Sequence, residues 1–294
     1  MKFGANTLIW SGSFGRAEFD LLPRIKETGF DGVEIPIFDV AGFDAAAVGR
    51  AISNAGLECT ACSALMGESS LITEDAAVRQ RTIGLMRDLI AAAAEAGARI
   101  LAGPMYSAVG YLPGRRRTAD EWKRAVDAWR ELGDTLTAHQ MTLAIEPLNR
   151  FETYFLNTAE DAARLCDEIG HPNVGILFDT FHANIEEKSI GAGLRTCARH
   201  LKHVHTCEND RGTPGTGHVE WSEVFGALGE LGYDGWLTIE SFGFNIPEIC
   251  AAAAIWRDLE KTPEQIAFDG VKFLKERAGA GDSVSSEKVA GRGR

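Results

Sequence analysis

Four strand-like segments in the second half of the chain each end in a carboxylate or a histidine. Glu146 follows the apolar run of "MTLAIE", Asp179 ends "VGILFD", His205 ends "LKHVH" and Glu240 follows the run of "WLTIE". A carboxylate directly after a buried strand is costly unless it is paired or bound to a cation, and converging carboxylates repel one another unless a cation neutralises them. Three carboxylates and one imidazole form a donor set without thiolate, which suits Mn²⁺, Mg²⁺ or Co²⁺ better than a structural zinc ion.

Two histidines lie two residues apart in the segment "LKHVHT". Because side chains alternate along a strand, His203 and His205 face the same side of it. His205 is nearer the carboxyl end and is the better candidate ligand. His203 lies one layer deeper, where we expect either a hydrogen-bonded core histidine or a residue that supports a ligand from behind.

Further polar residues follow the same segments in the loops. Glu152 lies in "NRFETYF" after the first of them, His182 lies in "DTFHANIEE" after the second, and Arg211 lies in "CENDRGTPGTGH" after the third. The Gly/Pro-rich surroundings of Arg211 predict a shaped loop, which is where a substrate-binding residue can sit. A solvated loop charge accounts equally well for Arg211 taken alone.

A repeating pattern of strands and helices must hold these residues. Eight short β-type runs alternate with helical segments, several of which begin at Asp, Ser or Thr or end at Gly. Such a repeat predicts parallel strands and right-handed crossovers, and eight units in roughly 280 residues favour an α/β fold of the closed (β/α)8 (TIM) barrel type. Its chemistry would lie at the carboxyl ends of the strands. An open dinucleotide-binding sheet is disfavoured, because "IWSGSFGRAEFD" after the first strand lacks the G-x-G-x-x-G pattern.

We expect one domain over residues 1–278, with two additions to the repeat. Residues 243–262 form an insertion after the eighth strand, and its apolar "CAAAAIW" is a candidate either for a subunit interface or for packing on its own barrel. Residues 279–294 are Gly/Ser-rich and charged, which predicts a flexible C-terminal tail.

Composition excludes several classes of function. The chain has 294 residues, 45% of them apolar, but no uninterrupted apolar run near the ~18 residues of a membrane span. A formal net charge of −12 and a pI of about 5.1 disfavour nucleic-acid binding, which needs a basic face. The N-terminus lacks the longer apolar segment of a signal peptide, so we expect a cytoplasmic protein.

The six cysteines are scattered and mostly lie within apolar patterns. Cys59 and Cys62 have the spacing of a zinc or redox motif in "CTAC", but no second pair accompanies them. Buried apolar cysteines are the favoured interpretation.

At these residues the sequence resembles a known family. The segments "IEPLNRFETYFLNT", "LFDTFHANIEE", "HVHTCENDRGTPGTGHVEWSEVFGAL" and "GYDGWLTIESF" resemble the D-tagatose 3-epimerase family, which includes D-psicose (D-allulose) and L-ribulose 3-epimerases among the xylose-isomerase-like barrels. The resemblance runs through the whole chain and is densest from about residue 140 to 260.

The resemblance implies an enzyme with one divalent metal ion per subunit, typically Mn²⁺, that inverts C3 of a free ketose. The metal ligands would be Glu146, Asp179, His205 and Glu240, and Glu146 and Glu240 would also be the acid/base pair. A cation chelated by O2 and O3 would stabilise the enediolate formed on deprotonation. Two carboxylates on opposite sides of C3 would remove and return the proton.

The resemblance also implies how the sugar is held. Glu152, His182 and Arg211 match family residues that bind the O1 to O3 region.

The N-terminal half departs more from the family pattern. Phe14 and Cys62 match its apolar wall against C4 to C6 only loosely, and Val109 in "GPMYSAVGY" stands where a tryptophan is often found. Phe242 is a further candidate for that wall, although a plain packing role accounts for it equally well. The preferred ketose is therefore left open. Related barrels commonly form dimers or tetramers, so we expect a homodimer or homotetramer.

Three alternatives remain beside ketose 3-epimerase. A sugar isomerase on the same metal barrel, of the aldose–ketose or hydroxypyruvate type, would move hydrogen between C1 and C2. A barrel endonuclease of the abasic-site class would need more metal ligands and a basic face. The third alternative is a non-catalytic sugar-binding protein, and the two facing glutamates argue against it.

Overall fold

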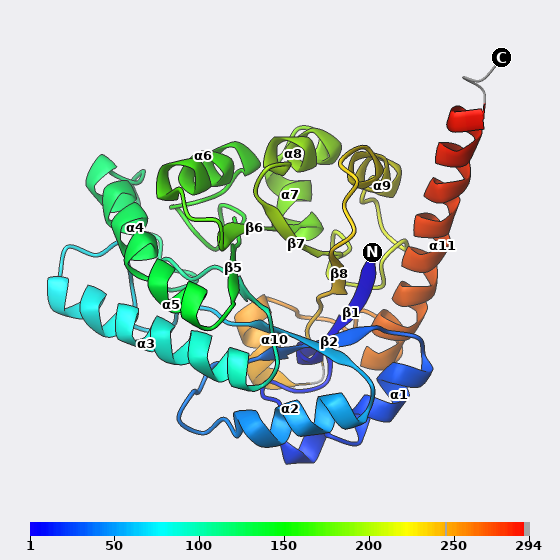
Figure 1. Ribbon diagram of the computed structural model, residues 1–294, viewed down its shortest axis with the longest axis horizontal. Coiled ribbons are helices and arrows are strands. Elements are labelled where there is room, and N and C mark those ends of the chain that lie inside the picture. The colour runs from blue at the N-terminus through cyan, green and yellow to red at the C-terminus, as the bar shows by residue number, and fades with distance from the viewer. Residues whose placement is uncertain (245, 291–294) are drawn as a thin grey trace.

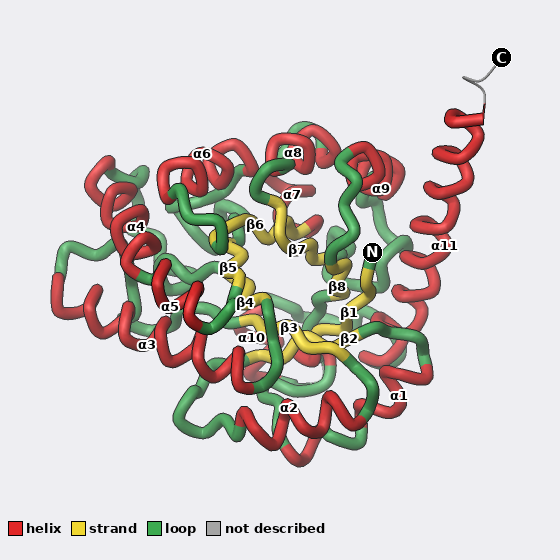
Figure 2. The backbone as a smooth tube through the Cα atoms, viewed as in Figure 1, coloured by secondary structure: helices red, strands yellow, loops and turns green. Residues whose placement is uncertain are grey.

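The computed structural model describes residues 1–244 and 246–290, and a ring of parallel strands forms its centre. Figure 2 shows the strands enclosed by helices, as the sequence predicts for a (β/α)8 barrel. The strands are β1 (Lys2–Asn6), β2 (Gly32–Pro36), β3 (Glu58–Cys62), β4 (Ile100–Gly103), β5 (Thr142–Ile145), β6 (Val174–Asp179), β7 (Leu201–His205) and β8 (Trp236–Ile239).

Each strand pairs with its sequence neighbour, and β1 closes the ring by pairing with β8 as well as with β2. In this closure Phe3 lies opposite Leu237, and Gly4 lies opposite both Thr238 of β8 and Gly32 of β2. All carboxyl ends therefore meet on one side of the barrel, where the strand-end groups lie.

The helices are α1 (Leu21–Glu27), α2 (Ala45–Asn54), α3 (Ala76–Glu95), α4 (Ala119–Glu131), α5 (Gly133–Ala138), α6 (Ala159–Ile169), α7 (Thr180–Glu186), α8 (Ile190–Cys197), α9 (Trp221–Glu230), α10 (Pro247–Ala253) and α11 (Pro263–Ala290), with short 3-10 turns η1 (Thr7–Ile9) and η2 (Arg16–Glu18). Figure 1 shows the chain winding once around the ring. No helix in the described part of the chain is both long and apolar enough to cross a membrane.

Alternation along the strands separates two environments. On β2, Val33 and Ile35 belong to the main apolar core, together with Ile25 of α1 and Val48 of α2. Glu34 between them must point the other way, into the barrel. The strands thus present apolar side chains to the helices and can present polar ones to the interior near the mouth.

The chain departs from one helix per strand at particular places. Strand β1 ends at Asn6, where the Asn6 side chain accepts a hydrogen bond from the Leu8 amide and caps the turn η1. Two helices lie between β4 and β5, because the helical stretch is interrupted at Leu132, which separates α4 from α5. Two helices follow β6, because Ser189 caps a new helix, α8, by accepting from the Ala192 amide.

The insertion at 243–262 contains α10, which packs on its own barrel. Ile249 of α10 forms a small apolar cluster with Leu8 and Cys62. Trp256, further along the insertion, is 78% exposed. The last helix, α11, crosses the expected boundary at 279 and runs to Ala290, and residues 291–294 of the expected tail lie outside the described residues. The flexibility of that tail stays a prediction.

Candidate metal centre and active site

The four predicted strand-end groups converge at the barrel mouth. One donor atom from each of Glu146, Asp179, His205 and Glu240 lies within 4.8 Å of the others. All four residues are buried. They come from the ends of β5, β6, β7 and β8, so neighbouring strands supply them at one level, as the sequence analysis predicts.

Backbone and capping contacts fix the positions of two of these residues. The Glu146 amide donates to the carbonyl of Gly103 on β4 (3.2 Å), and its own carbonyl accepts from the Tyr106 hydroxyl (3.1 Å). Asp179 is also the N-cap of α7, where Oδ1 accepts from the Phe181 amide (2.6 Å). The cap fixes the Asp179 side chain and leaves Oδ2 facing the site.

Arg211 places its guanidinium among the carboxylates. Nη1 donates to Asp179 Oδ2 (2.8 Å) and to Glu240 Oε2 (2.7 Å), and Nη2 lies 3.1 Å from His182 Nε2. The guanidinium lies over the ring of Phe181, with the Arg211 Cζ 4.0 Å from the ring centroid. Arg211 is buried, so the sequence-based alternative of a solvated loop charge is wrong.

The surrounding protein shifts the pKa values of Glu146 and Glu240 in opposite directions. Burial and the neighbouring Glu240 raise the pKa of Glu146 well above its usual range. Burial also raises the pKa of Glu240, but His205 and Arg211 outweigh it and lower that pKa to about 2. The two carboxyl groups are thus pushed in opposite directions by their surroundings, an arrangement that fits an acid/base pair.

These residues fit a divalent cation. Glu146 Oε1 is buried and accepts no hydrogen bond. The unpaired Nδ1 of His205 lies 3.4 Å from Glu240 Oε1 and 3.9 Å from Asp179 Oδ2. A buried carboxylate oxygen and a ring nitrogen without hydrogen-bond partners are expected of ligands for a cation. The oxygen-rich donor set is the kind that manganese and magnesium take.

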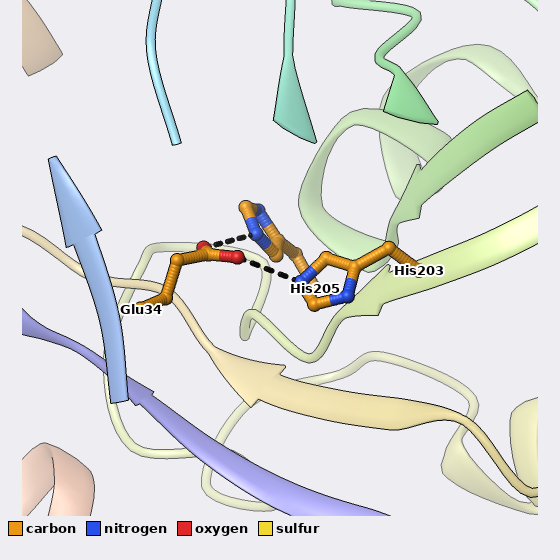
Figure 3. A group of neighbouring side chains, drawn as sticks. All are labelled: Glu34, His203 and His205. Atoms are coloured by element: carbon orange, nitrogen blue, oxygen red, sulfur yellow. Dashed lines mark hydrogen bonds and ion pairs between the residues drawn. The ribbon is translucent and has the colours of Figure 1, made fainter. Parts of the chain in front are cut away.

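A further acid, Glu34, lies beneath this site and was not predicted from the sequence. Figure 3 shows its carboxylate reaching His203 and His205 from across the barrel. Burial raises the pKa of Glu34, but the two histidines outweigh it and hold that pKa well below its usual range. The prediction that His203 is a deeper residue rather than a ligand agrees with this placement. A charged residue between Val33 and Ile35 in "GVEIPI" was the available signal.

His182 and Glu152, which the sequence resemblance implies as sugar-binding residues, are linked through Asn149. The His182 Nδ1 accepts from the Asn149 amide (3.0 Å), and its Nε2 lies 3.5 Å from Glu146 Oε1. The Asn149 side chain donates to Glu152 Oε1 (2.7 Å). Burial lowers the pKa of His182 to about 3 and raises the pKa of Glu152. His182 is therefore neutral at physiological pH.

The loop that carries Arg211 is organised by Glu208, another residue not singled out from the sequence. Its fully buried carboxylate accepts hydrogen bonds from the amides of Asn209, Gly215 and Val219 and from the indole of Trp221. Arg211 itself adopts a left-handed backbone conformation (φ 66°). The loop is thus shaped by its own backbone contacts to deliver the guanidinium.

The structure divides the residues of the expected apolar wall. Cys62 belongs to the small cluster with Ile249 of α10, and Phe242 packs against that cluster. Phe14 instead lies in the main apolar core beside Phe19, with ring centroids 6.1 Å apart. Val109 is 39% exposed. The predicted contact of Phe14, Cys62 and Phe242 with sugar is untested.

Comparison with known families assigns the fold. Residues 22–277 match the family model described as "Xylose isomerase-like TIM barrel". The matched range includes all four strand-end groups and Arg211.

Similar proteins cover nearly the whole chain. The chain is 36% identical to "Probable ketose 3-epimerase" of Synechocystis sp. over 94% of its length and 96% of the relative's, and 32% identical to "L-ribulose 3-epimerase" of Mesorhizobium japonicum over 88% of both. Among solved structures, "Structure of L-ribulose 3-epimerase" superposes with a TM-score of 0.93 at 29% identity, covering 100% of this chain and 99% of that one. A Methylomonas sp. D-allulose 3-epimerase in complex with D-allulose gives 0.89 at 28%, covering 94% and 97%.

Proposed function

Because the chain belongs to the xylose isomerase-like TIM barrels and, among them, to the ketose 3-epimerase family of isomerases, we propose that it is a metal-dependent enzyme that inverts C3 of a free ketose of the D-tagatose, D-fructose/D-allulose or L-ribulose type. One observation carries the proposal: two buried glutamates of opposite proton affinity share a four-residue ligand cluster with Asp179 and His205.

The metal would be held by Glu146, Asp179, His205 and Glu240, with Mn²⁺ as the first choice and Mg²⁺ or Co²⁺ as alternatives. A divalent cation held by these residues would supply Lewis-acid stabilisation of the negative charge that develops when C3 loses its proton.

The protein's own part is to move that proton. In one direction Glu240, the ionised carboxylate, takes the proton from C3 and leaves an enediolate. Glu146, whose pKa is raised by its surroundings, is the group that returns a proton to the other face of C3. In the reverse direction the two residues exchange roles, so the sugar need not turn over between steps.

The remaining polar residues hold the sugar in register. For the sugar oxygens O1 to O3, Arg211 provides hydrogen-bond donors and Glu152 provides acceptors. The neutral His182 can make one further hydrogen bond to the same oxygens. His182 lies beside both Glu146 and Arg211, which couples sugar orientation to the acid/base pair.

The test is a panel of ketoses with chelated enzyme and with Mn²⁺-reconstituted enzyme. Tagatose, fructose, allulose, sorbose, ribulose and xylulose of both hands would be incubated and the products separated by sugar chromatography. We expect the C3 epimer to form only with metal. An aldose as the main product from a free ketose would overturn the proposal in favour of an isomerase acting between C1 and C2.

The proposal extends to assembly and location. The six cysteines are free thiols, which fits the reducing cytoplasm. The strongly exposed Trp256 and Phe151 are apolar side chains that a homodimer or homotetramer interface could cover. Light scattering coupled to size-exclusion chromatography would give the mass in solution, and a monomer at micromolar concentration would contradict this part of the proposal.

A further inference from the structure

Glu34 sits in the interior of the barrel with two imidazoles against its carboxylate (Figure 3). Oε1 lies 2.7 Å from His205 Nε2, and Oε2 lies 2.8 Å from His203 Nε2. All three side chains are at most 1% exposed. Burying a charge costs desolvation free energy that an apolar residue of the same size would not incur. We therefore look for a role of Glu34 other than packing.

Glu34, His203 and His205 lie close enough together to form a second candidate cation group, but both oxygens of Glu34 also have neutral donors beside them. Oε1 also accepts from Asn6 Nδ2 (3.0 Å), and Oε2 also accepts from Thr60 Oγ1 (3.1 Å). Each oxygen therefore has one ring nitrogen and one neutral donor at ordinary hydrogen-bond distance. The neutral donors set Glu34 apart from Glu146, whose Oε1 has no hydrogen-bond partner.

The contact with Glu34 determines which nitrogen of His205 faces the candidate metal ligands. His205 Nε2 donates to Glu34, and His205 Nδ1 is the atom that lies 3.4 Å from Glu240 Oε1. The two ring nitrogens are thus divided between two carboxylates on different strands. A hydrogen bond at the far nitrogen fixes both the ring orientation and the nitrogen that stays free to bind a metal.

We propose that Glu34 is a positioning residue that holds the His205 ring with Nδ1 toward the metal site. His203 completes the device by keeping the second carboxylate oxygen in place. The inference rests on the proposed metal-dependent function, because it concerns how one metal ligand is presented.

The experiment compares Glu34→Gln with wild type and with Thr60→Val. Thr60→Val removes a neutral donor from Oε2 but leaves the Oε1–His205 contact, so it is the matched control. Dissociation constants for Mn²⁺ would be measured on metal-stripped protein by electron paramagnetic resonance of the free ion. We expect Glu34→Gln to weaken Mn²⁺ binding by roughly 10- to 100-fold and Thr60→Val to stay close to wild type.

A spectroscopic readout separates positioning from general loss of structure. Co²⁺ loaded to saturation should give the same visible absorption bands in wild type and Thr60→Val, and altered bands in Glu34→Gln, because the histidine donor is displaced. Melting temperatures in EDTA would show whether each variant is folded. If Glu34→Gln does not fold, Glu34→Asp replaces it in the experiment. The aspartate keeps the negative charge but is one methylene too short to hold both rings, so we expect the same weaker Mn²⁺ binding and altered Co²⁺ bands.

The outcomes distinguish the two proposals. Wild-type protein that binds no Mn²⁺ would overturn the proposed function itself. Wild-type protein that binds Mn²⁺, with folded Glu34 variants that match its affinity and its Co²⁺ bands, would overturn the positioning role alone.

Discussion

Single residues decide how charge is balanced at the mouth of this barrel. Arg211 donates to Asp179 Oδ2 and Glu240 Oε2 at the same time, which places a permanent positive charge on two of the candidate metal ligands. The guanidinium and a divalent cation therefore act on the same carboxylates and repel each other. If Arg211 binds the sugar as proposed, the same guanidinium that holds the substrate weakens the binding of a cation.

Glu240→Gln should abolish turnover while sugar binding survives at least in part. The amide keeps the size of the side chain but cannot accept the C3 proton, and general acid–base groups contribute roughly 10²- to 10⁴-fold to rate. Turnover measured by chromatography and ketose binding measured by calorimetry would test this with Mn²⁺ present. Unchanged turnover in the variant would refute the role given to Glu240.

Arg211→Met should separate metal binding from catalysis. Removing the guanidinium relieves its repulsion of the cation and frees two carboxylate oxygens, so Mn²⁺ should bind more tightly, by about tenfold if the change is worth about 1.4 kcal/mol. The catalytic efficiency kcat/KM for the ketose should fall, because the variant lacks the group proposed to bind the sugar. Mn²⁺ titration and steady-state kinetics measure the two effects separately. Weaker Mn²⁺ binding would contradict the competition described above.

At the scale of elements, the first turn of α4 shows how a helix start is secured. Thr118 Oγ1 accepts from the Glu121 amide, and Glu121 Oε2 accepts from the Thr118 amide (2.7 Å), which completes a capping box. Arg115 and the Tyr154 hydroxyl also donate to the same carboxylate. Burial raises the pKa of Glu121, but these donors outweigh it and lower that pKa to about 2.

Glu121→Gln should therefore destabilise the protein in a pH-dependent way. Because the folded pKa lies below the usual 4.5, the ionised carboxylate adds stability that is fully present above about pH 5 and is lost as the pH falls from 4.5 toward 2. We expect a cost of about 1 to 3 kcal/mol at pH 7, shrinking in acid. Urea denaturation at a series of pH values measures the difference.

The matched control for that experiment is Glu131→Gln, at the other end of α4. Glu131 pairs with Arg87, but both side chains are exposed, by 40% and 44%. Its replacement should change the free energy of unfolding by less than about 1 kcal/mol. Equal losses in the two variants at pH 7 would contradict the special role of the capped, buried carboxylate.

The strand ends could be predicted from the sequence because the pattern there is local. Glu146 and Glu240 each interrupt an apolar run at its carboxyl end, and the barrel topology then brings such ends together. Glu34 could not be placed in the same way, because its partners are on β7, far along the chain, and only the closed ring brings β2 to face them. The interruption at Leu132 did have a local signal, Gly133, which begins the next helix.

The expected contacts of the apolar wall were the weakest part of the sequence prediction. Cys62 and Phe242 meet at one cluster through α10, an element outside the βα repeat. Phe14, which shares their chemistry, packs instead with Phe19 in the main core. The apolar character of a residue does not specify its packing partner, so which cluster each of these residues joins depends on the completed fold.

For the whole molecule, metal binding should act as a source of stability. Ligands that bind only the folded state stabilise it by mass action, by about 2.7 kcal/mol at a hundred times the dissociation constant. Mn²⁺ should therefore raise the Tm of metal-stripped protein by several degrees, and excess EDTA should reverse the rise. Differential scanning fluorimetry measures both. Asp179→Asn, which loses one ligand charge, should show a smaller rise, and an equal rise in that variant would place the ion elsewhere.

The pairing of β1 with β8 has a consequence for synthesis on the ribosome. β1 is the first strand to emerge, and one of its two edges is paired only by β8, which ends at Ile239. Until that residue has left the exit tunnel, the nascent chain carries an unpaired strand edge flanked by apolar residues such as Phe3 and Ala5. Open edges of this kind invite pairing with other chains. Protection by chaperones would therefore matter most during the time between the emergence of β1 and the emergence of β8 from the ribosome.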